Sequence, residues 1–157
     1  MNTLNLPDQK RKPKKTAYRK PESVKLLEAM ADQAAIKKYP GTPVQYLAPR
    51  KHRDDSANSL TKCIVDFIGF SGGFASRINS TGIYDKRLGK YRPGTSRKGL
   101  ADIMATFKGL SLHIEVKFGN DRQSEAQMKI QREVESSGGY YFIAKDFSSF
   151  KIWFDNI

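Results

Sequence analysis

The sequence has a single cysteine and no long apolar segment, and both absences limit what the chain can be. Cys63 alone cannot form an intramolecular disulfide, and a zinc site built from several cysteines is excluded as well. Because Cys63 lies in an apolar run that ends at Ile68, we interpret it as a core residue and not as a nucleophile. No apolar run approaches the roughly 20 residues of a membrane-spanning helix. Residues 1–10 lack the apolar stretch of a secretion signal, so we expect a cytoplasmic protein with no membrane insertion.

Acidic residues are scarce relative to basic ones. The 157 residues include 28 Lys and Arg against 16 Asp and Glu, which gives a formal net charge of +12. Residues 1–53 hold 13 of the basic residues and only four of the acidic ones. A chain this basic favours polyanionic partners, nucleic acid first and an anionic membrane surface second. The hydrophobic fraction of 38%, with nine Phe and seven Tyr, excludes a wholly disordered chain.

Three segments differ in composition. Residues 1–20 are expected to form a basic, flexible arm, either a phosphate-binding arm or a solubilising or targeting tail; its cations include Lys10, Arg11, Lys12, Lys14 and Lys15. Residues 21–53 are predicted to contain a helix over 22–38 and then a linker interrupted by Pro40, Gly41 and Pro43. Residues 54–157 are predicted to form the compact domain.

Hydrophobic spacing within residues 54–157 predicts the order helix, strand, hairpin, helix, strand. Helices are expected over 56–70 and 124–136, and strands over 74–79, 101–107, 110–118 and 140–144. For residues 146–154 we favour a short helical turn followed by a strand. Residues 81–99 are expected to form a long basic loop, which is either functional or simply a solvated charged loop. This order predicts an α/β class fold, in the form of an α+β sandwich around a small mixed sheet flanked by helices.

The predicted hairpin brings two carboxylates face to face. A two-residue turn at Lys108-Gly109 places Ile103 opposite Ile114 and therefore Asp102 opposite Glu115. One face of the hairpin is then entirely apolar and belongs on the core: Ile103, Ala105, Phe107, Leu110, Leu112, Ile114 and Val116. The other face carries Asp102, Met104, Thr106, Ser111, His113, Glu115 and Lys117. A slip of one residue would destroy this separation.

Two carboxylates opposed across a hairpin repel each other, because their Cβ atoms are about 4.5–5.5 Å apart. Mg²⁺ removes the conflict, since it binds one or two carboxylates together with water and substrate phosphate. The backbone carbonyl of Val116 is a further candidate ligand, and Lys117 can hold an attacking water or offset charge on a phosphate. The alternative is a solvated strand face on which Lys117 only neutralises Asp102 and Glu115. The basic surroundings favour phosphodiester chemistry.

The segments Lys98-Gly99-Leu100-Ala101-Asp102-Ile103 and Ile114-Glu115-Val116-Lys117 resemble the PD-(D/E)xK nuclease motif. The resemblance is closest to its virus-type replication-repair (VRR-NUC) branch and to related phage endonucleases and Holliday-junction resolvases. Arg77-Ile78-Asn79-Ser80 resembles the strand that precedes the motif, and Ser124-Glu125-Ala126-Gln127 the helix that follows it. The likeness covers roughly Asn58 to Ala144 and implies a restriction-endonuclease-like core. It implies that Asp102 and Glu115 bind Mg²⁺ or Mn²⁺, that Lys117 assists the water, and that Gln127 lines the site.

The chain departs from this family pattern at two positions. Ala101 replaces the usual Pro, which supplies no ligand. The acidic residue often found in the first core helix has no clear counterpart near Asn58, so a second metal is less expected. Gln127 is also consistent with a capping box from Ser124, and His113 is more consistent with an exposed strand residue than with a catalytic one. The expected nucleic-acid contacts are Arg77, Asn79, Ser80, Lys86, Arg87, Lys90, Arg92, Arg97 and Lys98, together with the basic arm.

The function expected from these features is a metal-dependent endonuclease, a hydrolase acting on DNA more readily than on RNA. The resemblance suggests a role in replication, recombination or repair of a phage or mobile element. One alternative is a Holliday-junction resolvase, which would act as a homodimer. Others are a non-catalytic nucleic-acid-binding protein on a nuclease fold and a basic structural protein, which would not need the carboxylate pair.

Overall fold

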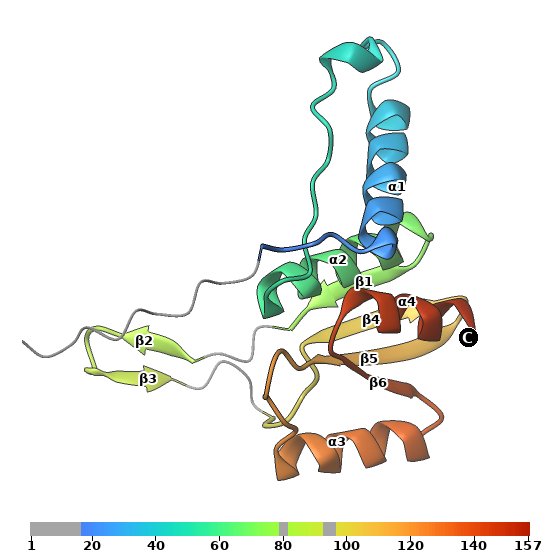
Figure 1. Ribbon diagram of the computed structural model, residues 1–157. Coiled ribbons are helices and arrows are strands. Elements are labelled where there is room, and N and C mark those ends of the chain that lie inside the picture. The colour runs from blue at the N-terminus through green and yellow to red at the C-terminus, as the bar shows by residue number, and fades with distance from the viewer. Residues whose placement is uncertain (1–16, 79–81, 93–96) are drawn as a thin grey trace, which may run out of the picture.

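The chain folds as a mixed α+β protein. The structure is a computed structural model that describes residues 17–78, 82–92 and 97–157. In chain order its elements are α1 (Glu22–Lys38), the 3₁₀ helix η1 (Val44–Tyr46), α2 (Ala57–Phe70), β1 (Phe74–Arg77), β2 (Ile83–Asp85), β3 (Lys90–Arg92), β4 (Ile103–Phe107), β5 (Leu110–Val116), α3 (Glu125–Ser136), β6 (Tyr140–Ala144) and α4 (Phe147–Asp155) (Figure 1). Within the described ranges, no helix combines the length and apolar character that crossing a bilayer requires.

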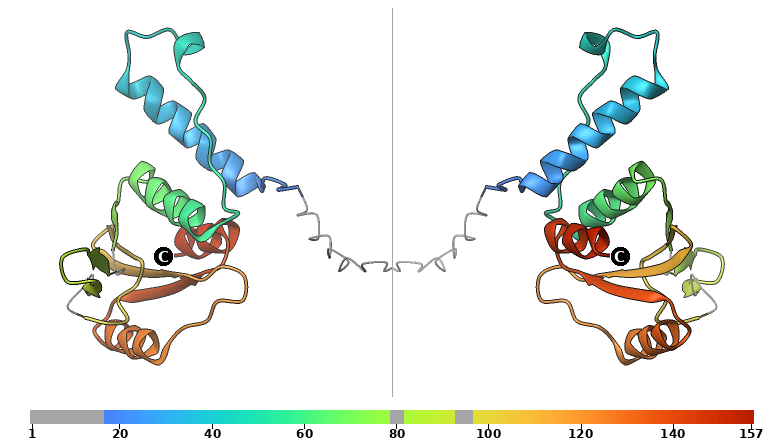
Figure 2. Two further views of the ribbon diagram at one scale, coloured as in Figure 1. Left: turned by 90° about the vertical axis from the view of Figure 1, so that its left-hand side faces the viewer. Right: turned by 90° about the vertical axis from the view of Figure 1, so that its right-hand side faces the viewer.

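The main sheet is small and mixed, as the sequence predicts. Its strand order is β1-β4-β5-β6, in which β1, β4 and β5 are antiparallel and β5 pairs with β6 in parallel. Helix α3 forms the crossover between these two parallel strands. Helices α1, α2 and α4 lie on one face of the sheet and α3 on the other (Figures 1 and 2). Strands β4 and β5 are therefore the central strands of the sheet.

The hydrophobic core lies between the sheet and helices α1, α2 and α4. It includes Leu60, Ile64, Phe67 and Ile68 of α2 and the aromatic residues Phe147, Phe150 and Phe154 of α4. Phe67 packs edge-on against Phe147 and Phe154, with ring centroids 5.5 and 5.4 Å apart. Val24 and Leu27 of α1 are fully buried in the same cluster, so the core extends N-terminally of residue 54. The C-terminal half of α1 projects away from the layers (Figure 2).

The hairpin of β4 and β5 has the predicted register. Ile103 pairs with Ile114, and Phe107 with Leu110 across the two-residue turn. Lys108 and Gly109 have φ values of 47° and 80°, and the turns that match the twist of a hairpin require positive φ at both central positions. The apolar face is on the core side, where Ile103, Leu112 and Ile114 are fully buried. The polar face consequently points toward the layer of α3.

Two sequence predictions require correction. Residues 147–155 form helix α4 and not a turn followed by a strand, because the Asp146 side chain caps the helix by accepting a hydrogen bond from Ser149 N at 2.7 Å. The large aromatic residues at 147, 150 and 154 then lie on one helical face. The expected loop over 81–99 contains the two-stranded hairpin of β2 and β3, in which Tyr84 and Tyr91 pair directly. The other predicted helices agree with the structure to within one residue.

Candidate active site

Asp102 lies just before β4, at the end of the hairpin far from its turn. The register of β4 and β5, continued by one residue, places Asp102 opposite Glu115. A carboxylate oxygen of Asp102 accepts a hydrogen bond from Val116 N at 2.9 Å, and its main-chain oxygen accepts one from Ile78 N at 2.7 Å. Both neighbouring segments of the sheet therefore hold Asp102 in place.

Glu115 is buried, with only 1% of its surface exposed. Its Oε1 atom accepts hydrogen bonds from Gln127 Nε2 at 2.5 Å and from Lys117 Nζ at 2.9 Å. Its Oε2 atom is buried without a hydrogen-bond partner in the part of the chain that the structure describes. Burial, together with the negative charge of Asp102, raises the pKa of Glu115 despite the opposing effect of Lys117. A buried carboxylate oxygen without a partner is costly and calls for an explanation.

Lys117 keeps its charge close to Glu115. Its backbone N–H donates to Ala144 O at 2.9 Å, so pairing with β6 continues past the end of β5. Nζ lies 2.9 Å from Glu115 Oε1 and 3.6 Å from Asp121 Oδ2. Burial by itself would lower the pKa of Lys117, but the three acids Glu115, Asp121 and Asp102 raise it on balance. The buried surroundings of Lys117 therefore favour its protonated form.

Gln127 both caps helix α3 and contacts Glu115. Ser124 Oγ accepts a hydrogen bond from Gln127 N at 3.3 Å, and Gln127 Oε1 accepts one from Ser124 N at 2.9 Å, which completes a capping box. The amide nitrogen of the same side chain donates to Glu115. One residue thus fixes the start of α3 and links that helix to the buried carboxylate.

Gly99 brings the segment before Asp102 against the start of α3. Its φ is +86°, and a Cβ atom at this position would lie 2.4 Å from Ala126 O. Only glycine fits such a close approach to backbone without a shift. The Lys98-Gly99-Leu100 segment therefore sets how near α3, and with it Gln127, lies to the carboxylates.

The residues at hand fit a hard divalent cation with a small protein donor set. Asp102 and Glu115, whose Oε2 is unpartnered in the described structure, offer carboxylate oxygens at opposed positions of the hairpin, and Val116, next to Glu115, offers a main-chain carbonyl. Magnesium is usually held by one or two carboxylates plus waters and phosphate. Across the described ranges, no group of three or more His, Cys, Asp or Glu side chains is placed to bind a metal. A richer set of ligands, such as a dinuclear site needs, is therefore not found there.

The acids at the start of α2 have structural partners. Asp54 is buried and accepts hydrogen bonds from Tyr18 Oη at 2.7 Å and from Phe147 N at 3.3 Å. Asp55 pairs with Arg53. Cys63 is fully buried, as predicted, and burial raises the pKa of its thiol to about 12. Asp54 thus links the N-terminal segment to the start of α4, and these residues are not part of the carboxylate cluster.

The predicted nucleic-acid contacts are distributed around the fold. Arg77 is exposed at the end of β1, and Lys86, Arg87, Lys90 and Arg92 belong to the exposed β2–β3 hairpin. Arg92 pairs with Asp85, and Arg97 with Glu133 of α3. Lys98 is exposed immediately before Gly99. Asn79, Ser80 and the arm residues Lys10, Arg11, Lys12, Lys14 and Lys15 lie outside the described residues.

Sequence reasoning did not single out Tyr141 or Asp121. Tyr141 pairs with His113 across β5 and β6, and burial and the charge of Glu115 raise the pKa of its phenol to about 12. Tyr141 stands in an apolar run, which gives no indication of a site. Asp121 could have been found, because it follows Lys117 by four residues. His113 is half-buried, which lowers its pKa, and its Nε2 lies 3.4 Å from Ser111 Oγ. The structure thus gathers Asp102, Glu115, Lys117 and Gln127, with Tyr141 nearby.

Comparison with known proteins yields no match: no family model, no curated protein and no solved structure is significantly similar to this chain.

Proposed function

We propose that this protein is a metal-dependent nuclease that hydrolyses phosphodiester bonds in DNA, with its centre at Asp102, Glu115 and Lys117. The observation that carries the proposal is Glu115: it is buried beside a second acid and a buried lysine, and one of its oxygens has no partner in the described structure. A stable fold gains nothing from that arrangement, whereas a cation between the two acids would stabilise it. The resemblance of these segments to the PD-(D/E)xK motif supports the same function.

Each residue of the cluster has a physical role in this proposal. Asp102, Glu115 and the Val116 carbonyl hold Mg²⁺ or Mn²⁺, which when bound would polarise the phosphate and lower the pKa of a nearby water. Gln127 fixes the orientation of Glu115 by its hydrogen bond to Oε1. Lys117 remains protonated and offsets the negative charge that develops on the phosphate. The cations of the β2–β3 hairpin and of residues 1–20 bind phosphates of the strand without selecting a sequence.

A cleavage assay tests the proposal. Supercoiled plasmid, linear duplex, single strands and a four-way junction are incubated with the protein and Mg²⁺ or Mn²⁺. We expect Asp102→Asn and Lys117→Met to reduce cleavage by at least about 100-fold. The matched control is Asp155→Asn, which makes the same chemical change at an exposed residue of α4 whose partner is Lys151.

The outcomes separate the alternatives. Cleavage that survives both substitutions would show that the centre lies elsewhere. Cleavage restricted to the four-way junction would define a resolvase. Binding of every substrate with cleavage of none would support a non-catalytic binding protein instead.

A further inference from the structure

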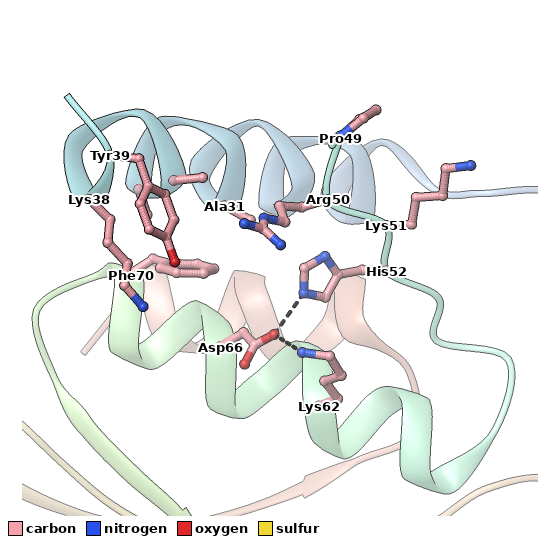
Figure 3. Close-up of a pocket in the computed structure, with 12 residues that line it drawn as sticks. Ala31, Lys38, Tyr39, Pro49, Arg50, Lys51, His52, Lys62, Asp66 and Phe70 are labelled. Atoms are coloured by element: carbon pink, nitrogen blue, oxygen red, sulfur yellow. Dashed lines mark hydrogen bonds and ion pairs between the residues drawn. The ribbon is translucent and has the colours of Figure 1, made fainter. Parts of the chain in front are cut away.

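A pocket lies between α1, the segment that precedes α2, and α2 itself (Figure 3). Its volume is about 450 Å³, within the usual range for sites that bind small molecules. Helices α1 and α2 cover the face of the sheet opposite to α3 (Figure 1). The pocket is therefore on the opposite side of the sheet from the candidate nuclease centre and contains none of its residues.

The wall formed by residues 49–52 is held by its backbone. Arg50 N donates to Asp32 Oδ1 at 2.8 Å, and His52 N donates to Glu28 Oε1 at 2.7 Å. These two acids of α1 are therefore engaged by main-chain groups. The guanidinium of Arg50 has no hydrogen-bond or ion-pair partner among residues 17–78, 82–92 and 97–157, and Figure 3 shows it extending into the pocket between Tyr39 and His52.

His52 is the most informative lining residue because it is 6% exposed and only half satisfied. Its Nε2 atom donates to Asp66 Oδ2 at 2.7 Å, and Asp66 also pairs with Lys62. Its Nδ1 atom is buried and has no partner within the described residues. In Figure 3 this second ring nitrogen is on the side of Arg50. A buried ring nitrogen accepts a hydrogen bond in the neutral ring and donates one in the protonated ring, so a polar ligand group would satisfy it.

The remaining lining residues combine positive charge with aromatic surface. The charged residues around the pocket are Lys38, Arg50, Lys62 and a single acid, Asp66, together with Lys51, whose side chain points away from it (Figure 3). Tyr39 and Phe70, which are 43% and 38% exposed, form one side of it (Figure 3). Cationic side chains bind phosphate, and exposed aromatic rings stack on nucleobases.

We propose that this pocket binds a nucleotide. The phosphate lies against Arg50, the base stacks on Tyr39 or Phe70, and His52 Nδ1 bonds to a polar group of the sugar or base. Either a free nucleotide or one unit of a single-stranded nucleic acid presents these groups. Simple anion binding would require only the cations and would leave the aromatic side unused.

Isothermal titration calorimetry of the full chain in EDTA, which prevents cleavage, tests this proposal with AMP, inorganic phosphate and a single-stranded tetranucleotide. We expect Arg50→Gln to weaken nucleotide binding by at least about tenfold, because a charge-assisted bond to phosphate is lost. This variant keeps the Arg50 N–H bond to Asp32, so the segment should stay in place. Tyr39→Leu should weaken binding by about fivefold or more. The matched control is Lys51→Gln, which removes the same charge from a side chain that points out of the pocket (Figure 3) and should change affinity by less than about twofold.

Two results support the proposal and identify the source of the ligand. AMP binding as tight as that of the tetranucleotide indicates a free nucleotide, and binding of the tetranucleotide alone, sensitive to Arg50 and Tyr39, indicates a strand. Three results overturn it: no binding of either nucleotide ligand to wild type, equal affinity for phosphate and AMP, or the same response to Arg50→Gln and Lys51→Gln.

Discussion

Replacing Asp102 with Asn separates the chemical role of this carboxylate from its structural role. Asp102 accepts a hydrogen bond from Val116 N at 2.9 Å, and an Asn side-chain oxygen can accept the same bond, whereas Ala cannot. The charge of Asp102 also adds to the effect of burial in raising the pKa of Glu115, so Asp102→Asn removes a repulsion. We therefore expect Asp102→Asn to leave stability unchanged or to increase it.

The expected magnitudes differ clearly between the two variants. Leaving the Val116 N–H without its acceptor in Asp102→Ala should cost about 1–3 kcal/mol. For a chain of this length, 1 kcal/mol corresponds to a change in Tm of roughly 2–4 °C, so Asp102→Ala should melt roughly 2–12 °C below wild type. The free energy of unfolding of Asp102→Asn should lie within about 0.5 kcal/mol of the wild-type value or above it.

Thermal melts with and without Mg²⁺ or Mn²⁺ provide the measurement. An ion present at about ten times its dissociation constant stabilises the native state by about 1.4 kcal/mol, which is about 3–6 °C here. Wild type and the control Asp155→Asn should show this gain, and both Asp102 variants should lose it. An undiminished gain in Asp102→Asn would refute the role of Asp102 as a ligand. Equal melting of Asp102→Asn and Asp102→Ala would refute the argument from the Val116 bond.

Three further substitutions test other parts of the cluster. Gly99→Ala should lower the free energy of unfolding, measured in urea, by about 2 kcal/mol or more, because its Cβ would meet Ala126 O. The loss should exceed that of Gly109→Ala, where φ is similar but the space is open. Equal costs would show that close packing on α3 is unimportant. Glu115→Gln should become more stable relative to wild type as the pH rises above about 4.5, since the raised pKa of Glu115 makes its ionisation unfavourable in the folded state. A pH-independent difference between the two proteins would contradict this. Lys117→Met should abolish cleavage yet keep the ion-dependent rise in Tm; loss of both would mean that Lys117 also maintains the ion site.

The candidate site was accessible to sequence analysis because its parts are local. Asp102, Glu115 and Lys117 stand at fixed offsets from one two-residue turn, and the alternation of a strand decides which side chains share a face. Ser124 and Gln127 form a capping box, which is also a local motif. The hairpin register and most element boundaries followed from the same short-range rules.

The features that sequence analysis missed depend on long-range packing. Residues 147–155 become a helix whose aromatic face is selected by Phe67, some 80 residues earlier in the chain. Nothing in the sequence indicated that His52 lines a pocket, because its partners come from two different helices. Its ring bonds to Asp66 of α2, and its backbone N–H donates to the carboxylate of Glu28 of α1. Val24 and Leu27 joined the core although α1 has only a thin apolar stripe. The contacts of His52 and of α1 join segments whose proximity no local pattern encodes, whereas the Asp146 cap of α4 is a local signal.

The position of the carboxylate cluster explains how the fold tolerates it. Asp102 and Glu115 lie at the same end of the two central strands, whose opposite face is anchored in the core by fully buried residues such as Ile103 and Ile114. The strands cannot separate to relieve the repulsion without giving up this packing, which contributes about 1.5–3 kcal/mol for each large side chain. The fold itself therefore holds the two acids at opposed positions of the hairpin. An ion that binds there meets ligands that are already in place, so little of its binding energy is lost in ordering them, and the same rigidity would keep a bound phosphate aligned with Lys117.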